Sequence, residues 1–100
     1  MAYKLVIKPE VFNDIQLAID YYNSKKRGLG NKFIDAVDKS FIILKKNPSF
    51  QIRYDDVRCL PVKKYPYMIH YIINKDTKTV TIIGVINTYM DPDLWKSRMY

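Results

Sequence analysis

The sequence is short, rich in apolar residues and strongly basic. Its 100 residues are 48% hydrophobic, which suits one small domain spanning residues 1–100 and excludes a disordered chain. The chain has 17 lysines and arginines against 10 acidic residues, a formal charge of +7. So basic a domain is expected to meet an acidic partner such as nucleic acid, an acidic protein or a membrane surface.

Several classes of protein are excluded by what the sequence lacks. One cysteine and one histidine cannot form a disulfide framework or a Cys/His zinc site, and no glycine-rich phosphate loop follows a strand. No apolar run approaches the ~20 residues of a membrane span, and the first residues lack the apolar stretch of a signal peptide. We therefore expect a cytoplasmic protein with no metal, no other cofactor and no membrane attachment.

The first half of the chain is predicted to be a strand followed by two helices. Apolar and polar residues alternate over residues 2–8, as in a half-buried strand. Pro9 suits the first position of a helix over residues 9–26, and Gly28 can adopt the left-handed cap. Asn31 is the expected N-cap of a second helix over residues 31–46. The apolar stripes are Val11, Ile15, Ala18, Ile19 and Tyr22 in the first helix and Phe33, Ile34, Val37, Phe41 and Leu44 in the second.

The second half is predicted to contain three strands and a short helix. Residues 48–56 are typical of a polar connection, and strands are expected over residues 57–63, 67–73 and 79–86. Pro61 indicates an edge position or a bulge. Asp91 and Pro92 begin a short helix that carries Trp95 and Arg98. The order β-α-α-β-β-β-α predicts an α/β (α+β) fold, in which a helical hairpin packs on one face of a twisted, mainly antiparallel sheet.

Both faces of the last two strands are predicted to be apolar. Strict alternation places Met68, His70, Ile72, Val80 and Ile82 on one face and Tyr67, Ile69, Tyr71, Ile73, Ile83 and Val85 on the other. The helical hairpin can cover one of these faces. We expect the other to be covered by the final helix, by a second copy of the chain or by a segment of a partner.

Short motifs follow one another along nearly the whole chain. They are Tyr3-Lys4-Leu5, Pro9-Glu10, Asp14-Ile15, Tyr21-Tyr22, Gly30, Phe33, Asn47-Pro48, Arg58, Tyr65-Pro66-Tyr67, Tyr71, Asp91-Pro92, Trp95 and Arg98. In their order and spacing the chain resembles the RelE/ParE superfamily of toxins from type II toxin–antitoxin (plasmid stabilization) systems. The resemblance implies the same order of elements and a cytoplasmic toxin that inhibits growth. It also implies a cognate antitoxin, part of which is disordered until it folds onto the toxin.

The superfamily has two classes of target. One branch cuts mRNA on the ribosome, and the other inhibits DNA gyrase by binding it. The nuclease branch has an arginine near the position of Met68, and basic residues near those of Asn87 and Met90. Because Asn and Met can neither transfer a proton nor hold a phosphate as a cation, these departures favour a ParE-like toxin that acts by binding, or a catalytically weakened member. A ribosome-dependent mRNA endonuclease and a non-toxic binding domain are the alternatives, and either a homo-oligomer or a toxin–antitoxin hetero-oligomer is compatible with the sequence.

Three residues are candidates for catalysis in an endonuclease: Arg58, Tyr89 and Arg98. A guanidinium can hold a phosphate through two hydrogen bonds, which favours Arg58 as a clamp. The structural alternative for Arg58 is a bridge to Asp55, Asp56 or Asp91. Tyr89 would act as a general acid only if its pKa were strongly shifted.

Four residues are candidates for binding the target or nucleic acid: Lys63, Lys64, Tyr65 and Trp95. The two lysines would supply charge and the two aromatic rings would supply stacking. The alternative for Lys63 and Lys64 is a solvated strand edge, and the alternative for Trp95 is an anchor of the last helix. His70 is expected to be a packed, hydrogen-bonded strand histidine rather than a catalyst.

Overall fold

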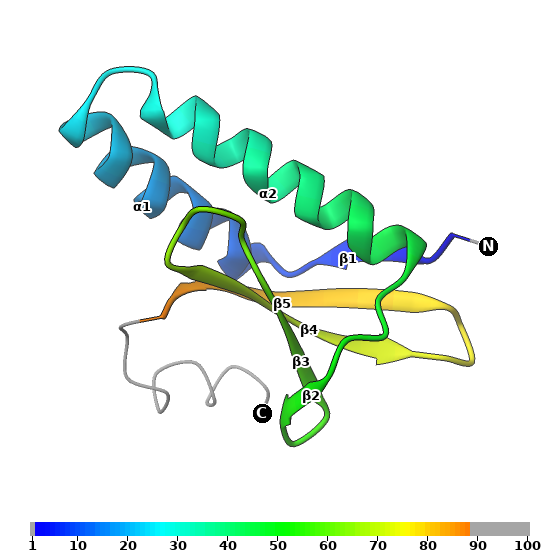
Figure 1. The fold of residues 1–100 in the computed structure, drawn as a ribbon. Coiled ribbons are helices and arrows are strands. Elements are labelled where there is room, and N and C mark those ends of the chain that lie inside the picture. Colours follow the sequence, from blue (N-terminus) through cyan, green and yellow to red (C-terminus); the bar gives the residue numbers. More distant parts are fainter. Residues whose placement is uncertain (1, 89–100) are drawn as a thin grey trace.

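The computed structural model describes residues 2–88, which form two helices and a five-stranded sheet (Figure 1). The elements are β1 (Lys4–Ile7), α1 (Pro9–Lys25), α2 (Leu29–Lys46), β2 (Ile52–Tyr54), β3 (Val57–Pro61), β4 (Tyr67–Asn74) and β5 (Thr79–Asn87). The predicted α+β order is confirmed from β1 to β5, with one short strand, β2, added inside the expected polar connection. The predicted final helix lies outside the described residues. In the described part of the chain, no helix is both long enough and apolar enough to cross a membrane.

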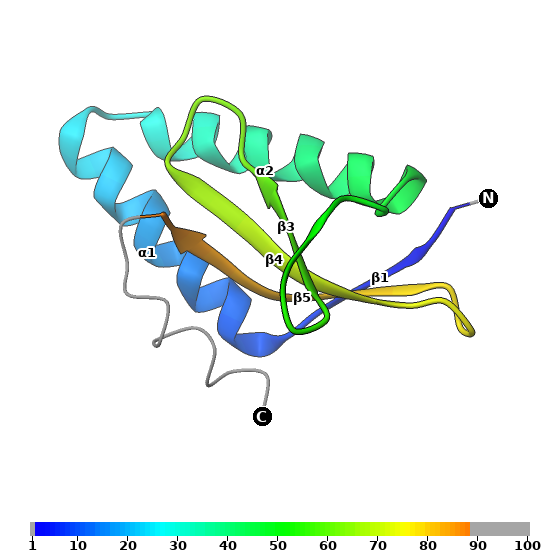
Figure 2. The same ribbon diagram turned by 60° about the horizontal axis from the view of Figure 1, so that its bottom comes forward.

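The sheet is mixed but mainly antiparallel, with the strand order β1-β5-β4-β3-β2. Among the described strands, β1 and β5 are the one parallel pair, whereas the pairs β5–β4, β4–β3 and β3–β2 are antiparallel. The hairpin of α1 and α2 lies on one face of this sheet, as predicted (Figures 1 and 2). Pro61 ends β3 beyond the residues that β2 pairs with, which confirms its edge position.

The two helices meet at a turn that requires glycine twice. Pro9 begins α1 as predicted, but α2 begins at Leu29 with Gly28 as its N-cap, so the prediction of Asn31 as N-cap is wrong. Gly28 has a φ of 91°, in the left-handed region that suits glycine. The backbone N–H of Gly30 donates to Asn23 Oδ1 at 2.9 Å, and a Cβ at Gly30 would lie only 2.8 Å from the Asn23 side chain. The helical hairpin therefore depends on close contact at Gly30.

The main core lies between the helices and the sheet. Its buried residues are Val11, Ala18, Phe33, Val37, Leu44, Leu60, Val62, Tyr67, Ile69, Tyr71, Val80, Ile82 and Val85. At one end, the rings of Phe33 and Tyr67 pack edge to face with their centroids 5.0 Å apart, and Tyr22 and Tyr65 join the same cluster. The helical stripes predicted from the sequence supply the helical side of this core, except that Ile34 is not among the residues of the cluster.

A bulge in β5 changes which face its side chains occupy. His70 pairs with Gly84 but Tyr71 pairs with Ile82, so Ile83 has no residue opposite it. Val80, Ile82 and Val85 therefore all face the helices, whereas Ile83 lies on the opposite face. The prediction that Val80 and Ile82 share a face with His70 is wrong, because strict alternation fails at a bulge.

The face opposite the helices carries a second, smaller apolar cluster. Val57, Cys59 and Ile83 are buried there, and Tyr54, Met68 and Ile72 pack against them. Because the first three are buried within one copy of the chain, this face does not in itself require a partner.

Candidate functional site

Arg58 lies on the helical side of the sheet and holds the connection between α2 and β2. Its guanidinium Nη1 donates to the backbone carbonyl of Phe50, and the nearby Tyr71 hydroxyl donates to the carbonyl of Pro48 at 2.7 Å. Arg58 and Tyr71 are directly paired across β3 and β4, so two neighbouring side chains fasten the same segment. This geometry favours the structural alternative for Arg58, with a backbone carbonyl as the partner in place of an aspartate.

Lys63 and Lys64 lie at the tip of the loop between β3 and β4, which curls towards α2 (Figure 2). The N–H of Tyr65 donates to the carbonyl of Val62 at 3.1 Å and closes a turn whose two central residues are these lysines. Lys64 has a φ of 73°, which is uncommon for a residue with a side chain. The turn therefore presents two adjacent ammonium groups beside the second helix.

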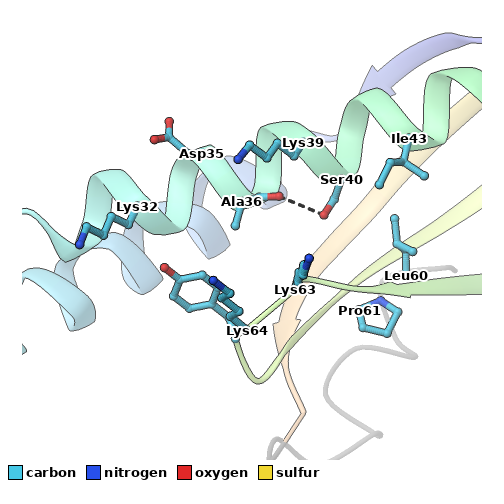
Figure 3. Close-up of a pocket in the computed structure, with 11 residues that line it drawn as sticks. Lys32, Asp35, Ala36, Lys39, Ser40, Ile43, Leu60, Pro61, Lys63 and Lys64 are labelled. Atoms are coloured by element: carbon cyan, nitrogen blue, oxygen red, sulfur yellow. Dashed lines mark hydrogen bonds between the residues drawn. The ribbon is translucent and has the colours of Figure 1, made fainter.

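The loop and α2 enclose a cavity of about 550 Å³ (Figure 3). We call it the basic cleft, and the residues that line it in the described part of the chain are Lys32, Asp35, Ala36, Lys39, Ser40, Ile43, Leu60, Pro61, Lys63, Lys64 and Tyr65. Four lysines and one aspartate therefore surround a largely apolar floor. Ser40 turns its hydroxyl back to the carbonyl of Ala36 at 3.0 Å, so its donor is used within the helix.

Tyr65 is part of the aromatic cluster of the core. Its ring packs edge to face against those of Tyr22 and Phe33, with a centroid distance of 5.2 Å in each case. These contacts hold the ring at the end of the basic cleft and occupy surface that a nucleobase would need for stacking. Of the three loop residues predicted to bind a target, the structure therefore brings two lysines into an accessible position and packs the aromatic ring inward.

A second pocket, of about 190 Å³, lies on the face of the sheet opposite the helices. We call it the sheet-face pocket, and its described lining is Arg53, Tyr54, Cys59, Met68, His70, Ile86, Asn87 and Thr88. His70 is buried, and its Nδ1 lies 3.0 Å from the Tyr54 hydroxyl and 3.4 Å from Cys59 Sγ. The hydroxyl and the thiol can each donate a hydrogen bond. A neutral imidazole that accepts at Nδ1 therefore satisfies this geometry. The prediction of a packed, hydrogen-bonded His70 is confirmed.

Two ionisable groups of the sheet-face pocket, the Tyr54 phenol and the Cys59 thiol, have raised pKa values. Burial raises the pKa of the Tyr54 phenol to about 12, and the neighbouring Cys59 and Asp55 add to this effect. Burial also raises the pKa of the Cys59 thiol to about 11, although Arg53 opposes it. A thiol with so high a pKa is a poor nucleophile, and a phenol of this kind is a weak general acid.

Some residues of both pockets were missed by sequence reasoning. Lys32 and Lys39 stand seven residues apart on α2, a spacing of two helical turns that could have placed them on one face. Tyr54 was missed because its strand, β2, has only three residues and lies between polar segments. Tyr89, Trp95 and Arg98 lie outside the described residues. Within residues 2–88, no group of three His, Cys, Asp or Glu side chains could hold a metal ion.

Comparison with known proteins identifies the fold. No family model matches the chain. No curated protein matches it either. Among solved structures, the chain is similar to one from the chromosomal ParDE TA system of P. aeruginosa, with a TM-score of 0.74 and 14% identity over 86% of this chain and 96% of that one.

Two structures of the E. coli toxin RelE are also similar. A double mutant in the free state has a TM-score of 0.70 with 14% identity, covering 99% of this chain and 96% of that one. The isolated toxin has a TM-score of 0.65 with 14% identity, covering 96% and 95%. The resemblance to the RelE/ParE superfamily that the motifs predict is thus confirmed at the level of the fold, which this chain shares with a component of the ParDE system and with RelE.

Proposed function

We propose that the chain is the toxin of a type II toxin–antitoxin module, which a cognate antitoxin neutralises in the cytoplasm. The observation that carries the proposal is the likeness of nearly the whole chain to RelE and to a chain of the ParDE system. The formal charge of +7 supports it, because a basic toxin suits an acidic target or inhibitor. The experiment is to induce the chain without any antitoxin and to measure growth, with a frame-shifted gene as control. Normal growth despite soluble, folded protein would favour the non-toxic binding domain.

Within this function, we propose that the toxin acts by binding, as a ParE-like protein with a gyrase-type target. Cleavage of RNA without a metal needs groups that take up and release protons and stabilise a crowded phosphate. In the described lining of the sheet-face pocket, the one strong cation is Arg53, and Tyr54 and Cys59 have pKa values near 12 and 11. With one arginine on an otherwise largely apolar lining, this pocket is better suited to apolar groups than to a phosphate. Lys63 and Lys64 remain our candidates for contact with the target, with Trp95 as a further prediction.

The alternative is a ribosome-dependent mRNA endonuclease, and one observation favours it. Arg53 lines the same pocket as the hydrogen-bonded Tyr54 and His70, so a guanidinium lies beside a donor and an acceptor of protons. Mapping mRNA ends and plasmid supercoiling in the same induced cells separates the two functions. New cuts at codon intervals, lost in Tyr54→Phe and retained in the matched Tyr21→Phe on the exposed surface of α1, would reject the binding function. Altered supercoiling with intact transcripts would reject the endonuclease.

A further inference from the structure

The basic cleft concentrates positive charge on two walls that come from distant parts of the sequence. Lys32 and Lys39 come from α2, and Lys63 and Lys64 come from the loop between β3 and β4 (Figure 3). Asp35 is the single acidic residue among the described residues of the lining. Opposed walls of one sign strengthen the local potential, because each ammonium group adds to the field of the others within a Debye length. The ligand that suits these walls carries several negative charges.

The floor of the basic cleft is apolar and accessible. It is formed by Ala36, Ile43, Leu60 and Pro61, and the side chain of Ile43 is 46% exposed. Burying such a surface stabilises a complex only if the ligand also has apolar groups. The volume of about 550 Å³ is in the range of sites that hold one compact ligand, so the cleft would take a few side chains of a segment and not a folded surface.

These features favour an acidic peptide over nucleic acid. Single-stranded nucleic acids bind on aromatic faces arranged along a basic groove, but the ring of Tyr65 is packed against Tyr22 and Phe33. Arginine, which holds phosphates in two-bonded geometry, does not occur in the described lining of the cleft. A segment with carboxylates on one side and aliphatic side chains on the other matches both the walls and the floor.

We propose that the basic cleft is a docking site for an acidic, apolar segment of a protein partner. This inference rests on the proposed function, under which the partner is the antitoxin. Its glutamates or aspartates would pair with Lys39 and Lys63 across the cleft, while its aliphatic side chains would cover Ile43 and Leu60.

The test uses purified, isotope-labelled chain and three synthetic peptides of equal length. The first peptide has glutamates and leucines in amphipathic spacing, the second has glutamine in place of glutamate, and the third has glutamine in place of leucine. We expect the first to shift the backbone amide resonances of residues 32–43 and 60–65, and to bind at least about tenfold more tightly than the other two. A short single-stranded RNA is titrated in parallel.

Charge reversal supplies the matched variants. Lys39→Glu with Lys63→Glu should weaken binding of the first peptide at least about tenfold, whereas Lys4→Glu with Lys75→Glu, an equal change of charge outside the cleft, should alter it less than about twofold. If the double variant Lys39→Glu with Lys63→Glu does not fold, Lys39→Gln with Lys63→Gln is used in its place. The proposal is overturned if the shifts lie elsewhere, if both pairs of variants weaken binding equally, or if the RNA binds the cleft more tightly than the peptide does.

The growth assay is a separate readout from the peptide titration. Growth arrest with no peptide binding in the cleft would overturn the docking site and leave the toxin function standing. Binding in the cleft by a chain that does not arrest growth would overturn the toxin function and leave an acidic-peptide site.

Discussion

The substitution Arg58→Ala distinguishes a structural residue from a residue that meets the target. In the structure, the half-buried guanidinium of Arg58 donates to the carbonyl of Phe50, beside the bond from Tyr71 to Pro48. A hydrogen bond from a charged group contributes about 1.5–3 kcal/mol, and its loss leaves a carbonyl without its donor. We expect the free energy of unfolding to fall by about 2 kcal/mol.

The assay is urea unfolding followed by circular dichroism. With an m-value of about 1.5 kcal/mol per M, the midpoint should fall by about 1.3 M. The control Arg53→Ala removes an exposed arginine from the adjacent strand β2 and should change the stability by less than about 0.5 kcal/mol. If Arg58→Ala abolishes growth arrest while its midpoint stays within about 0.3 M of the parent, the structural reasoning is refuted and Arg58 contacts the target.

Three further predictions concern stability. Lys64→Gly should raise the free energy of unfolding by about 0.5–1 kcal/mol in the same urea assay, because the left-handed backbone at this position suits glycine. An unchanged or lower urea midpoint would contradict this prediction. Gly30→Ala should lower the free energy of unfolding by about 1–3 kcal/mol, because the added methyl group would press on the Asn23 side chain. An unchanged free energy of unfolding would show that the helical hairpin relaxes freely around the methyl group. Stability should also decline from about pH 9 to about pH 12: burial raises the pKa of Tyr71 to about 12 and of Cys59 to about 11, so the unfolded chain loses these protons first. Replacing Tyr71 with Phe should flatten this decline, which urea midpoints measured across that pH range would show.

The helices and the long strands could be predicted because each has a repeating apolar pattern. The stripes of α1 and α2 and the β-branched residues of β5 indicate burial directly, and Pro9 marks the start of α1 by its backbone geometry. Gly28 was predicted to close the first helix, but its left-handed backbone lies at the N-cap of α2, so the start of that helix was placed two residues late. The short strand β2 was missed because three residues between polar segments show no period. The bulge at Ile83 was missed because it changes the face of the following residues without changing their apolar character.

The candidate sites were predicted only in part because they combine segments that are distant in sequence. Lys63 and Lys64 were found from their own charge, but their proximity to Lys32 and Lys39 depends on how the loop curls towards α2. The partner of Arg58 is a backbone carbonyl, and no residue type in the sequence marks such an acceptor. The contact between Tyr54 and His70 likewise requires β2 to pair with β3, which the sequence did not indicate.

The fastening of residues 48–50 by Tyr71 and Arg58 has a consequence for recognition. Because the end of α2 is tied to the middle of the sheet, the helix and β3 should move as one body. The opening between them would then keep the same width whether it is empty or filled. An incoming segment would have to give up its own conformational freedom, but the backbone of the receiving protein would lose little, and such preorganisation favours tight binding by a small contact area.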